Sequence, residues 1–305
     1  MRRFITKDIP FMRVRKVFYA ISLALVVISI VAIGARGLNL GIEFQGGTSI
    51  DFTSAEGIST EQMRQAFDDA GVSNATIQTT STNGQSGFLV RTSETVPDTA
   101  AAIANQVGAQ LGLPSDSYQV TTIGPEWGSN VMRQSLIAFI ISIAAIIVYI
   151  SIRFEYKMSL TAILALFHDL IIIVGIYALT GREITPNVIA ALLTILGYSL
   201  YDTVVVFHRI NENANPSMKH SYFWTANHSI NEVFIRTINT TLTSLIPVLC
   251  MLFFGGATLK DFAFAMALGL IFGSYSSIGV ASPLFAAWKT REPAYKRLAA
   301  KYGEA

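Results

Sequence analysis

The stretch of sequence that decides the fold is VIAALLTILGYSLYDTVVVF, residues Val188–Phe207, in which Asp202 is the only charged residue. About 20 consecutive apolar residues are enough to cross the hydrocarbon core of a bilayer as an α-helix. A carboxylate at that depth is costly and usually serves a function. This stretch therefore predicts a transmembrane helix that carries a functional acidic group.

Five further stretches have a similar length and apolar character. They are Val17–Ala35, Gln134–Ile152, Met158–Thr180, Val233–Phe254 and Phe262–Trp288. The apolar core of the first runs to about 17 residues, longer than the 7–15 of a signal sequence, so we expect an uncleaved anchor. The sequence thus predicts a polytopic α-helical membrane protein with six transmembrane helices.

The composition excludes several other classes of protein. The chain has 305 residues, of which 51% are apolar and only 14% are charged, and its mean hydropathy is +0.47. Soluble proteins carry about 25% charged residues, so a soluble enzyme or a disordered chain does not fit. One cysteine cannot build a disulfide scaffold, and a net charge of +2 gives no sign of nucleic-acid binding.

Lysine and arginine are enriched beside both ends of the predicted membrane region. Residues 1–16 carry six and residues 289–305 carry five, whereas two short loops on the other side carry only Arg182 and Lys260. Because such an excess marks cytoplasmic segments, we expect cytoplasmic flanks at 1–16 and 289–305. The first transmembrane helix is then 17–35, an extracytoplasmic domain is 36–133, and a five-helix bundle is 134–288.

The predicted outer domain has the pattern of a small α+β fold. Strands are expected at 50–53, 75–80, 87–92 and 117–123, with an Asn83-Gly84 hairpin turn between the second and the third. Helices are expected at Thr60–Ala70, behind a Ser59-x-x-Gln62 capping box, and at Thr99–Leu111. The order β-α-β-β-α-β predicts a ferredoxin-like sheet with its helices on one face. The domain has no histidine or cysteine and no catalytic constellation, so we expect a binding or mechanical module.

A glycine-rich motif connects the first predicted span to this domain. It runs from Gly41 to Thr48 and contains Glu43 and the pair Gly46-Gly47. Paired glycines allow positive φ angles and a close approach of two backbones. On physical grounds alone the motif predicts a tight structural turn.

Three ionisable residues stand inside the predicted spans. Asp169 lies near the middle of the third span, Asp202 in the fourth and Arg236 in the first turns of the fifth. Two stripes of hydroxyl residues follow Arg236 at helical spacing: Thr240 and Thr243 form one, and Thr237, Thr241 and Ser244 form the other. A hydroxyl-rich helix face needs polar partners or water, and Asp202 and Arg236 are the expected ion pair.

Two interpretations of this polar set remain open. The pair could fix the register of the helices without chemistry. Alternatively, Asp202 could take up and release a proton as Arg236 moves, along a path through Asp169, Thr237, Thr240 and Thr241. His168 is a weaker candidate for a proton relay. The small residues of the last span, such as Gly273 and Ser274, predict close helix packing.

Several of these segments together resemble a known family. Their resemblance is to the SecF proteins of the SecD–SecF family of bacterial protein export. It extends over about 270 residues, from the first predicted span to the end of the sixth, and it rests on these segments: Gly41–Thr48, Ala165–Asp169, Gly197–Arg209, Asn227–Ser244 and Ala281–Lys289. The most specific part is Gly197-Tyr198-Ser199 followed by Asp202-Thr203. The chain departs from the family pattern at Glu43 and His208, where the family usually has Asp, and at Tyr201, where it usually has Asn.

The resemblance implies a function that the residues alone do not show. A SecF protein resembles half of a resistance-nodulation-division transporter, with SecD as the other half. The pair is thought to use the proton-motive force to promote late translocation of proteins across the cytoplasmic membrane. The implied partners are SecD, the Sec translocation channel, the unfolded preprotein and the lipid bilayer. The family's proton-passage residues map onto Asp202 and Arg236, and the resemblance implies no cofactor.

Three other functions compete with this one. Tyr201-Asp202 is similar to half of the site of an intramembrane aspartyl protease, but Leu166–His168 lacks the Gly-x-Gly that should precede the second aspartate. A small-molecule or lipid exporter of the same superfamily would usually hold two such halves in one chain. A non-conducting membrane scaffold would use Asp202 and Arg236 only to hold helices together. We therefore expect a translocase subunit without enzymatic activity, whose coupling ion is H⁺ or Na⁺.

Overall fold

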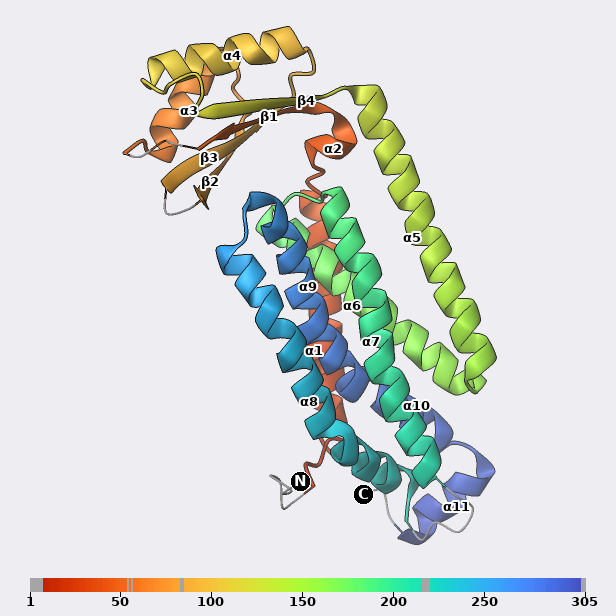
Figure 1. Ribbon diagram of the computed structural model, residues 1–305. Coiled ribbons are helices and arrows are strands. Elements are labelled where there is room, and N and C mark those ends of the chain that lie inside the picture. Colours follow the sequence, from red (N-terminus) through yellow and green to blue (C-terminus); the bar gives the residue numbers. More distant parts are fainter. Residues whose placement is uncertain (1–7, 54, 56, 83–84, 215–219, 303–305) are drawn as a thin grey trace.

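A computed structural model describes residues 8–53, 55, 57–82, 85–214 and 220–302 (Figure 1). The predicted turn at Asn83-Gly84 lies outside these residues. Within the described part of the chain, six helices are long and apolar enough to cross a membrane, as predicted. They are α1 (Arg15–Arg36), α5 (Pro125–Arg153), α6 (Tyr156–Thr180), α7 (Pro186–Asn213), α8 (Tyr222–Phe254) and a composite last helix. The last helix consists of α9 (Ala257–Ser276), the π-helical turn η1 (Ser277–Ala281) and α10 (Ser282–Lys289), and α11 (Pro293–Tyr302) follows it.

Several of these helices begin well before the apolar stretches that predict them. The N-terminus of α8 is set by Ser221, whose side chain accepts a hydrogen bond from the backbone N–H of Trp224. The N-terminus of α5 has a proline, Pro125, in its first turn. Capping residues rather than hydropathy therefore set these ends.

The helices of the bundle approach one another closely where a glycine faces a small or flexible neighbour. A Cβ on Gly175 of α6 would overlap Ser29 of α1, and one on Gly269 of α9 would overlap Ile195 of α7. This confirms that the small residues of the last span serve close packing. Helix α5 leans away from the rest of the bundle over much of its length (Figure 1), and only 6% of its most apolar window is buried.

The domain between α1 and α5 has the predicted ferredoxin-like topology. Its elements are β1 (Gly47–Phe52), α3 (Thr60–Asp69), β2 (Thr76–Thr82), β3 (Gln85–Thr92), α4 (Pro97–Gln110) and β4 (Tyr118–Ile123). The strand order is β2-β3-β1-β4, and all neighbouring strands are antiparallel. The predicted capping box of Ser59 and Gln62 is present at α3. Helices α3 and α4 cover one face of the sheet, and the other face is turned toward the membrane helices (Figure 1).

Side chains of the strands alternate between these two faces. Ile50 and Val90 belong to the core beneath α3 and α4, whereas Ser49, Leu89 and Arg91 line a cavity on the face turned toward the bundle. Because alternation places successive residues on opposite faces, the sheet presents a polar surface to the ends of the helices.

The glycine-rich motif forms the joint between α1 and the sheet. It begins with the short helix α2 (Ile42–Gln45), and Gly46 and Gly47 then have φ angles of +80° and +140°. A Cβ on Gly47 would overlap the carbonyl oxygen of Thr92. Thr48 follows, and its hydroxyl donates to the carbonyl of Glu94 at 2.7 Å. The motif is therefore a tight structural turn, as predicted, and it seats β1 beside β3.

Candidate functional site

Buried polar side chains meet inside the bundle where α6, α7, α8 and α9 come together. We call them the polar layer, and each is less than a tenth exposed. The polar layer consists of His168, Asp169, Ser199, Asp202, Thr203, Thr237, Thr241, Ser274, Ser276 and Ser277. A membrane interior offers no water to satisfy such groups, so they must bond to one another.

Asp169 is held on both carboxylate oxygens. Its Oδ2 accepts hydrogen bonds from the hydroxyls of Ser199 (2.7 Å) and Ser276 (2.8 Å). Its Oδ1 lies 2.9 Å from Nδ1 of His168, whose ring stacks on Tyr275. Asp169 therefore binds α6 to α7 and α9, and His168 helps to fix it.

Asp202 ends a short chain of hydrogen bonds between α7, α9 and α8. The hydroxyl of Ser274 donates to its Oδ2 at 3.1 Å. The same hydroxyl lies 2.5 Å from the hydroxyl of Thr241, which also lies 2.8 Å from the carbonyl oxygen of Thr237. Three hydrogen bonds thus follow one another from the carboxylate of Asp202 to the backbone of α8.

Arg236 does not form the expected ion pair with Asp202. Its guanidinium Nη2 donates to the hydroxyl of Tyr201 at 3.1 Å, and among the described residues no ion pair joins Arg236 to Asp202. Consecutive helical residues project about 100° apart. Asp202 therefore points into the bundle, while Tyr201 points outward and is 52% exposed. The guanidinium of Arg236 therefore lies on the outer side of α7, beside Tyr201, the residue that directly precedes the buried Asp202.

The other residues that the sequence predicts for the site lie either in the polar layer or between α7 and α8. The hydroxyl of Tyr198 donates to the carbonyl of Thr240 (2.9 Å) and lies 3.0 Å from the hydroxyl of Ser244, so it ties α7 to α8. The hydroxyl of Thr240 donates to the carbonyl of Arg236 within its own helix. At Gly197, a Cβ would meet no neighbour within 4 Å.

The hydrogen bonds of three serines in the last helix were not predicted from the sequence. Ser274, Ser276 and Ser277 bond to Asp202, Asp169 and Thr203. Small residues in a membrane helix are usually a sign of packing alone. The spacing of three hydroxyls within four residues, opposite two carboxylates on other helices, is the signal that could have identified them.

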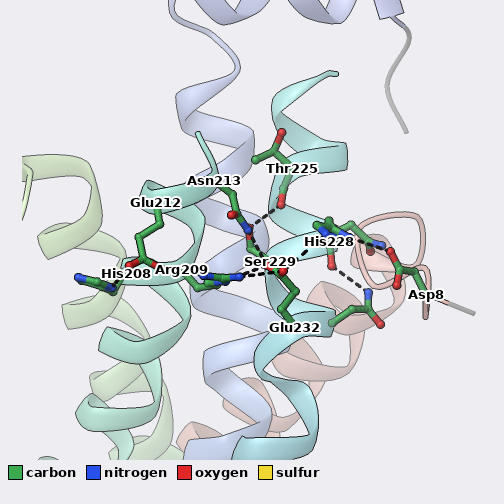
Figure 2. Close-up of polar contacts among 11 residues, drawn as sticks. Asp8, His208, Arg209, Glu212, Asn213, Thr225, His228, Ser229 and Glu232 are labelled. Carbon is green, nitrogen blue, oxygen red and sulfur yellow. Dashed lines mark hydrogen bonds and ion pairs between the residues drawn. The ribbon is translucent and has the colours of Figure 1, made fainter. Parts of the chain in front are cut away.

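A second polar network joins α7 to α8 (Figure 2), at the end of the bundle far from the sheet (Figure 1). The guanidinium of Arg209 forms two hydrogen bonds of 2.8 Å with the carboxylate of Glu232. Asn213 donates to Glu232 (2.6 Å) and to Ser229 (2.9 Å), and His228 lies 3.1 Å from Asp8. We call these residues the end cluster.

Three residues of the end cluster, His228, Ser229 and Glu232, belong to Asn227–Ser244, one of the segments that carry the family resemblance. Asn231 exchanges two hydrogen bonds with the backbone of Ile9, so α8 also holds the segment before α1. Arg209 lies two turns along α7 from Asp202, and Glu232 lies one turn along α8 from Arg236. The cluster therefore sets how these two helices face each other beside the polar layer.

Within the described residues, no group of three His, Cys, Asp or Glu side chains could hold a metal ion.

Six spanning helices, an inserted α+β domain and carboxylates bonded to hydroxyls inside the bundle define a polytopic membrane transport protein. Residues 104–291 match the family model "Protein export membrane protein SecD/SecF, C-terminal", and residues 31–55 match the "SecD/SecF GG Motif". The chain therefore belongs to the SecD/SecF family, in its SecF branch.

Individual relatives agree with this assignment. The SecF subunit of Desulfurispirillum indicum is 38% identical over 304 residues, which cover 96% of each chain. The SecDF protein of Bacillus subtilis is 37% identical over 91% of this chain, which spans 38% of that protein. The crystal structure of SecDF from Thermus thermophilus matches with a TM-score of 0.85 and 32% identity, covering 95% of this chain and 40% of that one.

These relatives establish the general role of the chain. It is a SecF subunit of the Sec protein translocase in the bacterial cytoplasmic membrane, and it belongs to a family of transport proteins rather than enzymes. Its partner is SecD, because the longer SecDF relatives join the two in one chain.

Proposed function

We propose that the chain, together with SecD, uses the proton-motive force to promote late translocation of proteins across the membrane, and that Asp202 takes up and releases the proton. The observation that carries the proposal is the chain of three hydrogen bonds from Asp202 through Ser274 and Thr241 to the carbonyl of Thr237. These groups are buried, so water in the bilayer core cannot replace a missing bond.

A count of the available protons explains why this series of hydrogen bonds suits a proton carrier. Three hydrogen bonds need three donated protons, but the hydroxyls of Ser274 and Thr241 have one each. A protonated Asp202 supplies the third by donating to Ser274, which then donates to Thr241. When Asp202 loses its proton, Ser274 turns to donate to the carboxylate, and one bond of the chain is lost. Protonation of Asp202 therefore reorganises contacts between α7, α8 and α9.

Arg236 supplies the second part of the proposed cycle. Its guanidinium rests on Tyr201, beside Asp202 but not paired with it. A nearby positive charge favours the ionised form of a carboxylate. Movement of Arg236 from Tyr201 toward Asp202 would thus drive release of the proton. Asp169 stays fixed by its own donors, and it holds α6 to α7 and α9.

The proposal includes an orientation in the membrane and further partners. The termini and residues 289–305 face the cytoplasm, and residues 36–133 face outward, as the distribution of lysine and arginine predicts. The N-terminal end of α1 and α11 lie at the end of the bundle opposite the sheet, which is consistent with this orientation (Figure 1).

The Thermus thermophilus relative is described as translocon-associated. We extend this to the present chain, with the Sec channel and an unfolded preprotein as partners.

The weakly covered helices leave room for SecD and lipid. Only 6% of the most apolar window of α5 and 17% of that of α8 are buried within the chain. Exposed apolar faces of this size in a membrane helix are covered by lipid or by another subunit. Because Arg236 and Tyr201 lie on the α7–α8 side, we place the contact with SecD there and lipid around α5.

The experiment is the substitution Asp202→Asn in membrane vesicles that contain SecD and the Sec channel. Translocation of a preprotein is measured with and without an imposed proton gradient, and in parallel with a sodium gradient. We expect a variant that assembles with SecD but no longer responds to the proton gradient. The control is Asp51→Asn, which removes a carboxylate from the sheet and should leave the response unchanged. A normal response in Asp202→Asn would instead favour a non-conducting scaffold.

A further inference from the structure

A buried ion pair connects the outer domain to the membrane helices. Nη1 of Arg91, on β3, lies 2.7 Å from Oε2 of Glu183, in the connection between α6 and α7. Arg91 is 8% exposed and Glu183 is 4% exposed. A charged pair that is so well covered is costly to break on one side, because the remaining charge stays buried and unpaired.

The backbone holds Glu183 in place for this contact. The N–H of Ile184 donates to the carbonyl of Asn39 (2.7 Å), and the N–H of Gly41 donates to the carbonyl of Ile184 (3.0 Å). The connection between α6 and α7 is thus paired with the segment between α1 and α2. Burial raises the pKa of Glu183, and the Arg91 guanidinium acts in the opposite direction.

Two more carboxylates lie within reach of the same guanidinium. Arg91 lines a cavity of about 190 Å³ together with Glu43 of α2 and Asp261 of α9. Oε2 of Glu43 is buried and has no hydrogen-bond partner among the described residues. The carboxylate of Asp261 has a longer contact with Arg182, at 3.3 Å, and the positive charge of Arg91 also acts on it. Arg91 could therefore change partner without leaving the cavity or exposing its charge. Glu183, whose pKa burial already raises, would then take up a proton instead of staying charged and unpaired.

Two of the three carboxylates, Glu183 and Asp261, are attached to the helices that carry the polar layer. Glu183 lies between α6, which bears Asp169, and α7, which bears Asp202. Asp261 lies at the outer end of α9, which bears the serines that bond to both acids. A shift of α9 against α7 on protonation of Asp202 would therefore move Asp261 against Glu183 at the outer end.

We propose that Arg91 and Glu183 are positioning residues that clasp the outer domain to the membrane bundle, and that the clasp must open during each cycle as Arg91 passes to Asp261 or Glu43. This inference rests on the proposed function, since it assigns the path by which the polar layer moves the outer domain. A static anchor would instead keep Arg91 paired with Glu183 throughout the cycle.

An apolar replacement of the pair distinguishes the clasp from an anchor. Replacing a buried ion pair with packed apolar residues usually preserves or increases stability. The double variant Arg91→Met with Glu183→Leu should therefore assemble with SecD. We expect its gradient-stimulated translocation to fall severalfold, because an apolar pair cannot be passed to another carboxylate. Wild-type translocation by this assembled variant would overturn the proposal.

A reversible tether tests the same point without changing the ion pair. Ser49→Cys on β1 and Asn187→Cys on α7 place thiols on two sides of the cavity, in a Cys250→Ser background that removes the native cysteine. A short bismaleimide with a disulfide in its spacer links them in the full SecD complex. We expect translocation to stop on linking and to recover after reduction. Continued translocation by the linked complex would contradict the clasp.

Two controls make the result specific. Ser49→Cys with Thr121→Cys joins register partners within the sheet, and this link should leave translocation unchanged. Asp202→Asn is assayed in the same vesicles. If Asp202→Asn translocates normally, the proton function is wrong. If Asp202→Asn is inactive while the tethered complex still works, only the clasp is wrong.

Discussion

The substitution Ser274→Ala tests the hydrogen-bond chain that gives Asp202 its proposed role. It removes one hydroxyl that bonds to Asp202 and to Thr241. Each neutral hydrogen bond contributes about 0.5–1.5 kcal/mol, and one to a charged group about 1.5–3. The free energy of unfolding should therefore fall by about 2–4.5 kcal/mol. Because the proton on Asp202 would lose its neighbour, we expect gradient-stimulated translocation to fall by about tenfold, which corresponds to about 1.4 kcal/mol in the barrier.

The assay compares Ser274→Ala with Ser282→Ala, a matched variant further along the same composite helix. Ser282 is fully buried and donates to the carbonyl of Ser277 at 2.6 Å, but it bonds to neither acid. Thermal unfolding in detergent measures the stability of both variants, and preprotein translocation in SecD-containing vesicles measures their response to the proton gradient. Both should lose stability, and only Ser274→Ala should lose the response. Equal responses in the two variants would refute the role given to Ser274.

Three further predictions concern other parts of the chain. Tyr201→Phe removes the hydroxyl that accepts from Arg236, which frees the guanidinium to favour the ionised form of Asp202, so the response of translocation to the proton gradient should fall in SecD-containing vesicles; an unchanged response would contradict this. Gly175→Ala forces α1 away from α6 and should cost about 1–3 kcal/mol in detergent unfolding, a loss that Gly197→Ala, with open space around it, should not show. Burial raises the pKa of Asp51, so its contribution to stability is present below the unfolded value and is lost as the pH rises through the raised one; hydrogen exchange of β1 should show this slope in the wild type and not in Asp51→Asn.

The sequence was sufficient to predict the spans, because the cost of placing a segment in lipid depends mainly on its composition and length. The ends of α5 and α8 were not predictable in this way, since Pro125 and Ser221 extend these helices beyond the apolar stretches. The sheet was predictable because alternation and turn residues are local signals. The clasp of Arg91 with Glu183 was not, because it joins residues 92 positions apart on separately folded elements.

The candidate site was predictable in its charges but not in its pairing. Asp169, Asp202 and Arg236 stand out because charges are rare in such spans. Whether Arg236 meets Asp202 or Tyr201 depends on the rotation of α7 and α8, which the sequence does not specify. Ser274 and Ser276 were interpreted as packing residues, because a serine in a membrane helix serves packing and hydrogen bonding equally well.

The π-helical turn Ser277–Ala281 lets the two halves of the last helix face different neighbours. Before it, Ser274 and Ser276 meet the acids; after it, Phe285 packs on Phe207, with ring centroids 5.1 Å apart. A π-turn holds one residue more than a regular α-helical turn. Deleting one residue there would give an unbroken α-helix but rotate its second half by about 100°. A change in the number of residues in this span would consequently disturb every contact after the π-turn, whereas a substitution disturbs the contacts of one side chain.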